Sequence, residues 1–152
     1  MNIATREASP ADIPAVAELF DRYRQFYGQA PNQALALEFI TERLTRHESV
    51  ILVAETARSG LIGFCQLYPS FCSVEAKPIY ALYDLFVLPS ARRCGVGKVL
   101  LQAAHAKAAS AGKIRMDLTT ARINTGAQSL YESQGWVRDD VFFAYSRQVT
   151  RP

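Results

Sequence analysis

Apolar and polar residues follow two different periods along this chain, and the changes of period mark its expected elements. Apolar positions recur at helical spacing in residues 13–27 and 32–46, and Ser9-Pro10 before the first of these runs is typical of a helix start. Two further helices are expected at 97–111 and 125–134, each followed by a glycine. Apolar runs flanked by turn residues predict strands at 3–8, 49–54, 61–68, 79–87, 114–119 and 141–149.

The order of these elements predicts a mixed α/β fold, formed by residues 1–152 as a single domain. A strand, a loop, a helix and another strand follow one another between residues 79 and 119, which requires a right-handed parallel crossover. We expect a sheet of six or seven strands, mostly antiparallel with a central parallel pair, flanked by about four helices. The segment 69–78 contains two prolines and mixed polarity, so we expect it to be a loop.

Composition narrows the classes of protein to which the chain can belong. The net charge of +3 is small and the basic residues are scattered apart from one cluster, which argues against a nucleic-acid partner. No apolar run is long enough for a membrane span, and the N-terminus does not resemble a signal peptide. Three cysteines without CxxC spacing and two isolated histidines predict free thiols and no metal site. We therefore expect a soluble cytoplasmic protein.

The basic cluster lies in a segment that has the form of a phosphate-binding loop. An apolar strand ends at Val87, a loop with Gly95 and Gly97 follows, and a helix then begins with its free N–H groups facing the loop. A P-loop is excluded because Arg93 stands where its first glycine would be, and neither Ser nor Thr follows Lys98. A dinucleotide fingerprint is excluded because Leu100 replaces its third glycine.

Three sequence segments together resemble the GNAT superfamily of N-acetyltransferases. The first is R-x-x-G-x-G at residues 92–97, and the second is Asn124 to Tyr131 followed by Gly135-Trp136. The third is Asp84-Leu85-Phe86-Val87 with Pro89 just upstream of the loop. The resemblance is specific over residues 79–147 and rests only on the pattern of elements over 1–78. It is nearest to a small branch with polyamine, amino-acid and histone acceptors.

The resemblance implies that the chain binds acetyl-CoA and transfers its acetyl group to an amine. Main-chain groups of one strand would hold pantetheine and the acetyl carbonyl, and the basic loop would wrap the pyrophosphate. Asn124 would contact pantetheine, and Tyr131 would act as general acid toward the departing thiolate. The implied cofactor-binding residues are Leu85, Phe86, Val87, Arg92, Arg93, Cys94, Gly95, Val96, Gly97, Lys98, Asn124 and Tyr131.

The acceptor and the general base are less fully specified by the sequence. Related polyamine acetylases carry a glutamate immediately before the aspartate, but this chain has Tyr83 before Asp84. Deprotonation through water assisted by Asp84 or Tyr83, or by Glu75, stays open. We expect a small-molecule amine bound near Tyr27, Tyr83 and Asp84. A protein-lysine or histone acetyltransferase and a non-catalytic acyl-CoA-binding module are the alternatives.

The last expected strand predicts how copies of the chain associate. Residues 141–145 read Val-Phe-Phe-Ala-Tyr, which would make both faces of the strand apolar near the end of the chain. An exposed apolar edge strand pairs readily with another chain, so we expect a homodimer.

Overall fold

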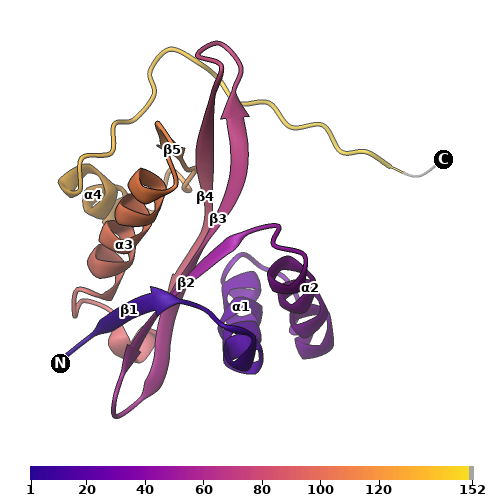
Figure 1. Ribbon diagram of the computed structural model, residues 1–152, viewed down its shortest axis with the longest axis vertical. Helices are drawn as coiled ribbons and strands as arrows, with labels where there is room; N and C mark the ends of the chain where they lie inside the picture. The colour runs from indigo at the N-terminus through magenta and orange to yellow at the C-terminus, as the bar shows by residue number, and fades with distance from the viewer. Residues whose placement is uncertain (151–152) are drawn as a thin grey trace.

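A five-stranded sheet in the order β1-β2-β3-β4-β5 runs through the computed structural model, which describes residues 1–150 (Figure 1). The strands are β1 (Ala4–Glu7), β2 (Val50–Thr56), β3 (Gly60–Cys72), β4 (Lys77–Val87) and β5 (Met116–Asp117). Neighbouring strands are antiparallel except β4 and β5, which run parallel. The predicted mixed sheet with one parallel pair is confirmed, although the described residues form five strands and not six or seven.

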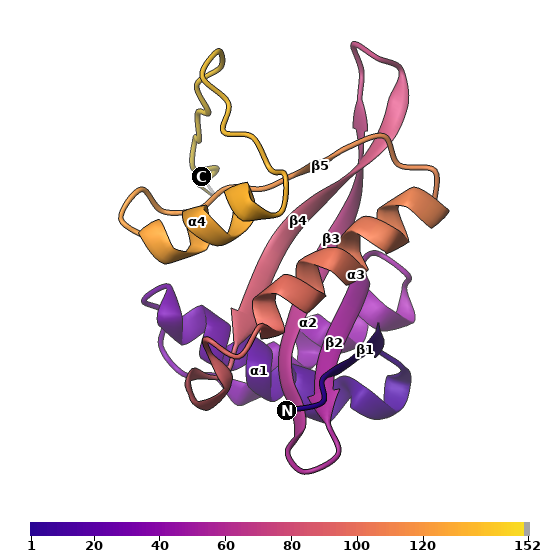
Figure 2. The ribbon, with the colours of Figure 1, turned by 90° about the vertical axis from the view of Figure 1, so that its left-hand side faces the viewer.

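Four α-helices cover the two faces of this sheet (Figures 1 and 2). They are α1 (Ile13–Phe26), α2 (Gln33–Thr45), α3 (Val96–Ser110) and α4 (Thr125–Ser133), with one-turn 3₁₀ helices at Pro10–Asp12 and Pro89–Ala91. Helices α1 and α2 bury Val16 and Ile40 with Phe64 on one face, while α3 buries Leu100 and Leu101 on the other. The apolar positions that recur at helical spacing in the sequence are therefore the positions that the helices bury in the two cores.

The segment 69–78 is not the loop that the sequence predicts, because it extends the β3–β4 hairpin. Pro69 pairs with Tyr80 and Pro78 with Phe71, and the turn lies between the strands at residues 73–76. Pairing with β2 ends at Leu67, and pairing with β5 begins at Tyr80. Each proline therefore lies where its strand has one free edge, and a missing N–H group can be tolerated there.

The predicted strand at 141–149 is also wrong, since these residues form no strand. They belong to an irregular segment after α4 that passes behind the tip of the β3–β4 hairpin in the view of Figure 1. A strand needs a hydrogen-bonding neighbour, and β5 pairs only with β4 within residues 1–150. The expected strand at 114–119 is reduced to two paired residues, Met116–Asp117.

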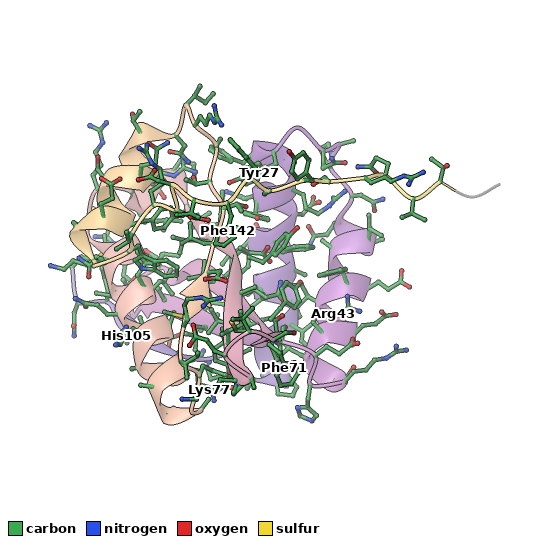
Figure 3. All side chains as sticks on the ribbon, turned by 90° about the horizontal axis from the view of Figure 1, so that it is seen from above. Tyr27, Arg43, Phe71, Lys77, His105 and Phe142 are labelled. Atoms are coloured by element: carbon green, nitrogen blue, oxygen red, sulfur yellow. The ribbon has the colours of Figure 1, made fainter. Side chains whose placement is uncertain are left out.

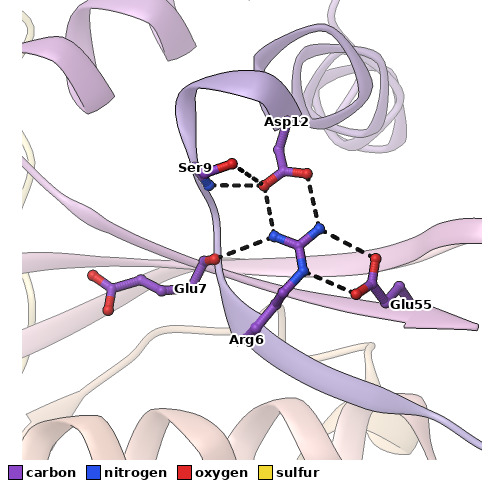
Figure 4. Close-up of polar contacts among 5 residues, drawn as sticks. All are labelled: Arg6, Glu7, Ser9, Asp12 and Glu55. Carbon is purple, nitrogen blue, oxygen red and sulfur yellow. Dashed lines mark hydrogen bonds and ion pairs between the residues drawn. The ribbon is translucent and has the colours of Figure 1, made fainter.

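A network around Arg6 fixes the start of α1 to the edge of the sheet (Figure 4). The Arg6 guanidinium donates to both Asp12 carboxylate oxygens, at 2.7 and 2.9 Å, and its Nε donates to Glu55 at 2.8 Å. Asp12 also accepts the Ser9 main-chain N–H at 2.7 Å. These bonds lower the pKa of Asp12 and join β1, β2 and the turn before α1. Helix α1, which lines the site described next, is thereby held in place.

Candidate active site

The parallel pair β4–β5 separates after two residue pairs, which leaves one edge of β4 open. Tyr80 pairs with Met116 and Ala81 with Asp117, and no later residue of β4 pairs with β5. Leu85, Phe86 and Val87, which the resemblance assigns to pantetheine and the acetyl carbonyl, lie in this part of β4. The main-chain groups of this segment on the β5 side, apart from the Val87 carbonyl, which accepts from Arg92, are therefore available to an extended ligand.

A β-bulge at Tyr83 marks the place where β4 begins to diverge. Gln66 pairs with Asp84 and Leu67 pairs with Leu82, so Tyr83 is an extra residue with no partner on β3. The Tyr23 hydroxyl of α1 donates to the Tyr83 carbonyl at 3.0 Å. Bulges redirect side chains beside functional sites, and this one places Tyr83, which is 71% exposed, next to the buried Asp84.

Asp84 is the end of a buried chain of polar side chains that crosses the sheet. Ser49 Oγ donates to Gln66 Oε1 at 2.7 Å, and Gln66 Nε2 donates to Asp84 Oδ2 at 2.5 Å. Burial raises the pKa of Asp84 to about 6, and its hydrogen bonds oppose this rise. Within residues 1–150, no basic side chain forms an ion pair with Asp84.

Asp84 is one of the residues that line a pocket of about 430 Å³ between the sheet and helices α1 and α2. Its lining residues are Phe20, Tyr23, Arg24, Leu35, Phe39, Tyr68, Tyr83 and Asp84. Arg24, the one basic residue among them, donates to Asp21 at 2.7 Å, so its charge is matched there. Aromatic rings around a carboxylate without a cationic partner favour a cationic ligand.

A second hollow of about 330 Å³ continues from this pocket toward the segment after β5. The two hollows share Tyr23, Arg24 and Tyr83, and we call them together the acceptor groove. The second hollow adds Tyr27, Gln29, Thr119, Thr120 and Ala121. Tyr27 also acts electrostatically on Tyr131 of α4, which places the groove near the predicted general acid.

Tyr131 is half-buried and its ring lies 6.1 Å from that of Trp136, measured between centroids. Burial, followed by the nearby Tyr27, raises the pKa of Tyr131 to about 12. The phenol is therefore protonated at neutral pH and has a proton to give. Asn124 is the N-cap residue of α4. Its Oδ1 accepts the Ala127 N–H at 3.3 Å, so this oxygen is already used to cap the helix.

The glycine loop has the backbone shape of an anion-binding site. Arg93 and Gly95 both have left-handed conformations, with φ of 61° and 84°, directly before α3 begins at Val96. Such alternation turns successive N–H groups toward one side, where the helix dipole adds to them. Val96 is buried and Cys94 is exposed, so Val96 can contribute only main-chain groups. The loop therefore fits a pyrophosphate.

The Arg92 side chain is held against β4 and α1. Its Nε donates to the Val87 carbonyl at 3.0 Å, and its guanidinium lies 5.7 Å from the Phe26 ring centroid and 5.6 Å from that of Phe86. The arginine thus joins the loop to β4 and α1. Its charge still lies at the loop, together with Arg93 and Lys98.

Close packing of α3 against α4 brings the two distant sequence motifs together. A Cβ atom on Gly97 would lie 2.9 Å from Leu130 Cδ2, which is closer than real side chains approach. The glycine therefore allows α4, with Tyr131, to rest beside the start of α3. The spacing of the motifs indicates this proximity, but only the structure explains the glycine.

Several residues of the site were missed by sequence reasoning, among them Gln66, Tyr68 and Thr119. Gln66 and Tyr68 lie on β3 within or beside a run of six buried and mostly apolar residues, and no local signal distinguishes them as site residues. Thr119 follows the short strand β5, and its position at the carboxyl end of a parallel strand could have indicated a ligand site. Glu75, the alternative base, instead lies at the hairpin turn beside Arg115, 3.5 Å away.

In the part of the chain that the structure describes, no three His, Cys, Asp or Glu side chains are gathered as metal ligands. No helix in the same part is long and apolar enough to span a bilayer.

The open edge of β4, the glycine loop before α3 and the half-buried Tyr131 form an arrangement consistent with a group-transfer enzyme that uses a phosphate-bearing donor. Residues 13–136 match the model of the acetyltransferase (GNAT) family. The chain belongs to this family and is an acetyl-CoA-dependent N-acetyltransferase.

Relatives and solved structures agree with this assignment. The chain is 47% identical over 149 residues to YhfO of Bacillus subtilis (strain 168), described as an uncharacterized N-acetyltransferase, with 98% of each chain covered. The crystal structure of a probable acetyltransferase matches with a TM-score of 0.89 and 37% identity, covering 100% of both chains. AAC(6')-Iy, solved with a bisubstrate analogue of CoA and acetylneamine, shares the fold at a TM-score of 0.80 and 22% identity, covering 98% of this chain and 100% of its own.

Proposed function

We propose that this enzyme acetylates an amine of a small molecule that enters the acceptor groove as an ammonium ion. The observation that carries the proposal is Asp84, a carboxyl group only 3% exposed, without a basic partner among the described residues and surrounded by aromatic rings. An unpaired buried carboxylate is costly, and an ammonium ligand removes that cost. Tyr23, Tyr68 and Tyr83 offer ring faces and hydroxyl groups to the same cation.

We assign to Asp84 the role of general base, for which the sequence lacks the glutamate of related polyamine acetylases. The reacting nitrogen must lose a proton before it attacks, and a carboxylate with a pKa near 6 accepts a proton far better than an ordinary aspartate. Tyr83 contributes its carbonyl to Tyr23 and its ring to the groove, so we assign it to binding. Glu75 is occupied by Arg115 at the hairpin turn and takes no part.

The proposed reaction balances with two groups of this chain. The ammonium ion first loses a proton to Asp84, directly or through water, and the neutral amine nitrogen then forms a bond to the acetyl carbon. The bond between that carbon and sulfur then breaks, and Tyr131 donates its proton to the departing thiolate. The Tyr131 phenolate takes back the extra proton of the amide nitrogen, which gives the N-acetyl amine and CoA as products, and Asp84 then releases its proton to solvent.

The loop from Arg92 to Lys98 would hold the pyrophosphate of acetyl-CoA. Its left-handed residues direct N–H groups to one side, and the charges of Arg93 and Lys98 add to the field there. The open edge of β4 at Leu85, Phe86 and Val87 would receive the pantetheine arm, with Asn124 on its other side.

Release of the CoA thiol, measured with a panel of amines, tests this proposal. The panel contains polyamines, amino acids, aminoglycosides and lysine peptides, and we expect turnover with a small cationic amine. Asp84→Asn should abolish most of that turnover, while Glu75→Gln, the matched control at the rival carboxylate, should not. Turnover confined to lysine peptides would identify a protein acetyltransferase instead. Acetyl-CoA binding without turnover on any amine would indicate a binding module.

A further inference from the structure

The first hollow of the acceptor groove, with a volume of about 430 Å³, is lined mainly by apolar side chains. Phe20, Leu35 and Phe39 come from α1 and α2, and Tyr68 and Tyr83 add their rings from β3 and β4. Phe20 stacks on Phe39 with ring centroids 5.1 Å apart, while Tyr68 and Tyr83 meet edge to face at 5.8 Å. An ammonium ion contacts only part of this surface, so the remainder fits an apolar body.

The charged groups of this hollow provide for one ammonium group. Asp84 is the only acidic residue in its lining, counted over residues 1–150. The basic residue, Arg24, donates to Asp21 at 2.7 Å, and Asp21 also accepts the Asn32 main-chain N–H at 3.1 Å. The Arg24 charge is thus neutralised inside the protein. A ligand with one positive charge balances the hollow, and a ligand with two does not.

A further cation lies beyond the rings, and its own carboxylates match it. Arg43 is on α2, on the side of the sheet away from α3 and α4 (Figure 3), and its guanidinium lies 4.3 Å from the Phe39 ring centroid. It forms ion pairs with Glu42 at 2.9 Å and with Glu48 at 3.2 Å, and these three residues lie outside the lining. A second ammonium group in the hollow would therefore lose its water against rings and gain no unpaired carboxylate from the described chain.

The position of Asp84 fixes how an acceptor lies in the hollow. Asp84 directly precedes Leu85 on the open edge of β4, where the acetyl group would be held, so the amine nitrogen must be at this end. Leu35 and Phe39 line the same hollow from α2, so the rest of the acceptor extends toward that helix.

We propose that the acceptor is a monoamine with a flat aromatic body, whose nitrogen binds at Asp84 and whose ring packs against Phe39 and Tyr68. This inference rests on the proposed function and narrows its substrate class. Polyamines and aminoglycosides would leave further ammonium groups among the rings, and an α-amino acid would bring its carboxylate beside that of Asp84. The hollow thus selects its acceptor largely by excluding a second charge.

Release of the CoA thiol with matched acceptors tests this selection. Phenethylamine is compared with phenylalanine, which adds a carboxylate, and hexylamine with hexamethylenediamine, which adds an ammonium group. We expect each added charge to lower kcat/KM at least about tenfold, with phenethylamine the best acceptor of the set. A higher kcat/KM for phenylalanine or for the diamine than for its monoamine counterpart would overturn the inference. Dependence of that turnover on Asp84 would still leave the proposed function standing.

A carboxylate added at the far end of the hollow should reverse the preference between monoamine and diamine. Leu35 lines the hollow and is 46% exposed, whereas Leu37, also on α2 and 42% exposed, lies outside the lining. Leu35 is in the first turn of α2, where an acidic residue suits the helix dipole, so Leu35→Glu should fold. We expect it to raise kcat/KM for hexamethylenediamine relative to hexylamine by about fivefold, and Leu37→Glu to leave that ratio unchanged. An unchanged ratio in Leu35→Glu, or an equal rise in Leu37→Glu, would overturn the inference.

The melting temperature separates this inference from the proposed function, because it reports binding without turnover. In the presence of CoA, phenethylamine should raise it more than hexamethylenediamine does, and the rise should be smaller in Asp84→Asn. A selective rise without acetylation of any amine would contradict the proposed function and support the ligand preference. Equal shifts with both amines, or no shift and no turnover, would overturn the inference.

Discussion

The side-chain amide of Gln66 donates a hydrogen bond to the carboxyl group of Asp84, and the two residues face each other on β3 and β4. Gln66 is fully buried and is itself held by Ser49. Because an amide N–H stabilises the ionised form, this bond holds the pKa of Asp84 below the value that burial alone would give. The pair sets the pH range in which the groove carries a negative charge.

Replacement of Gln66 by leucine should shift the activity profile toward higher pH. The wild-type kcat/KM should fall on acidification below about pH 6, where Asp84 becomes protonated. Gln66→Leu removes the donor and raises the pKa of Asp84 further, so this acidic limb should move upward. Ser49→Ala should cause a smaller shift in the same direction, because it loosens Gln66 without removing it. A lower maximal rate with an unmoved acidic limb would mean that Gln66 has only a packing role.

Asp84→Asn should increase stability while it removes activity. The folded state raises the pKa of Asp84 from 3.8 to about 6, so this group binds protons more tightly in the folded protein and destabilises it as pH rises through that window. The amide carries no charge and still accepts from Gln66. We expect a gain of up to about 3 kcal/mol at pH 7, diminishing toward pH 4. Urea unfolding at several pH values measures it, and equal stability of both proteins throughout would contradict it.

Tyr131→Phe should reduce turnover with little change in acetyl-CoA affinity. The ring and its contact with Trp136 stay, while the proton for the thiolate is lost. A positioned general acid contributes about 10²–10⁴-fold, and the loss should appear in both kcat and kcat/KM. Tyr80→Phe, at a buried tyrosine in the α3 core, serves as control. Full activity of Tyr131→Phe with any acceptor of the wild type would reject the assigned role.

The backbone of the glycine loop should matter more for acetyl-CoA binding than the side chain of Arg93. Arg93 has φ of 61°, a conformation that glycine adopts freely, so Arg93→Gly should keep the loop and weaken binding only through the lost charge. Gly95→Ala introduces a side chain at φ of 84° and costs about 1–2 kcal/mol of strain. Titration calorimetry with acetyl-CoA should show the larger loss for Gly95→Ala, and the reverse order would indicate recognition mainly by charge.

Binding should also be lost in Gly97→Glu, for two physical reasons. The carboxylate would enter the proposed anion site, and its Cβ would press on Leu130 of α4. Acetyl-CoA should therefore raise the melting temperature of the wild type but not that of the variant. An unchanged rise in the variant would remove the loop from the binding site.

Local patterns in the sequence determine the helices, most of the strands and the phosphate loop, because periodicity and capping act over a few residues. The prolines at 69 and 78 led to the wrong prediction of a loop, because the sequence does not show where a neighbouring strand ends. In the structure both prolines lie beside a free strand edge. Residues 141–149 have the composition of a strand, but a strand exists only when a second one lies beside it. The groups around Asp84, namely Gln66, Tyr23 and Tyr68, come from two elements, α1 and β3, that are distant from it in the sequence. Only the packing of α1 against β3 and β4 brings them together, since burial and pKa depend on neighbours in space and not on neighbours in sequence.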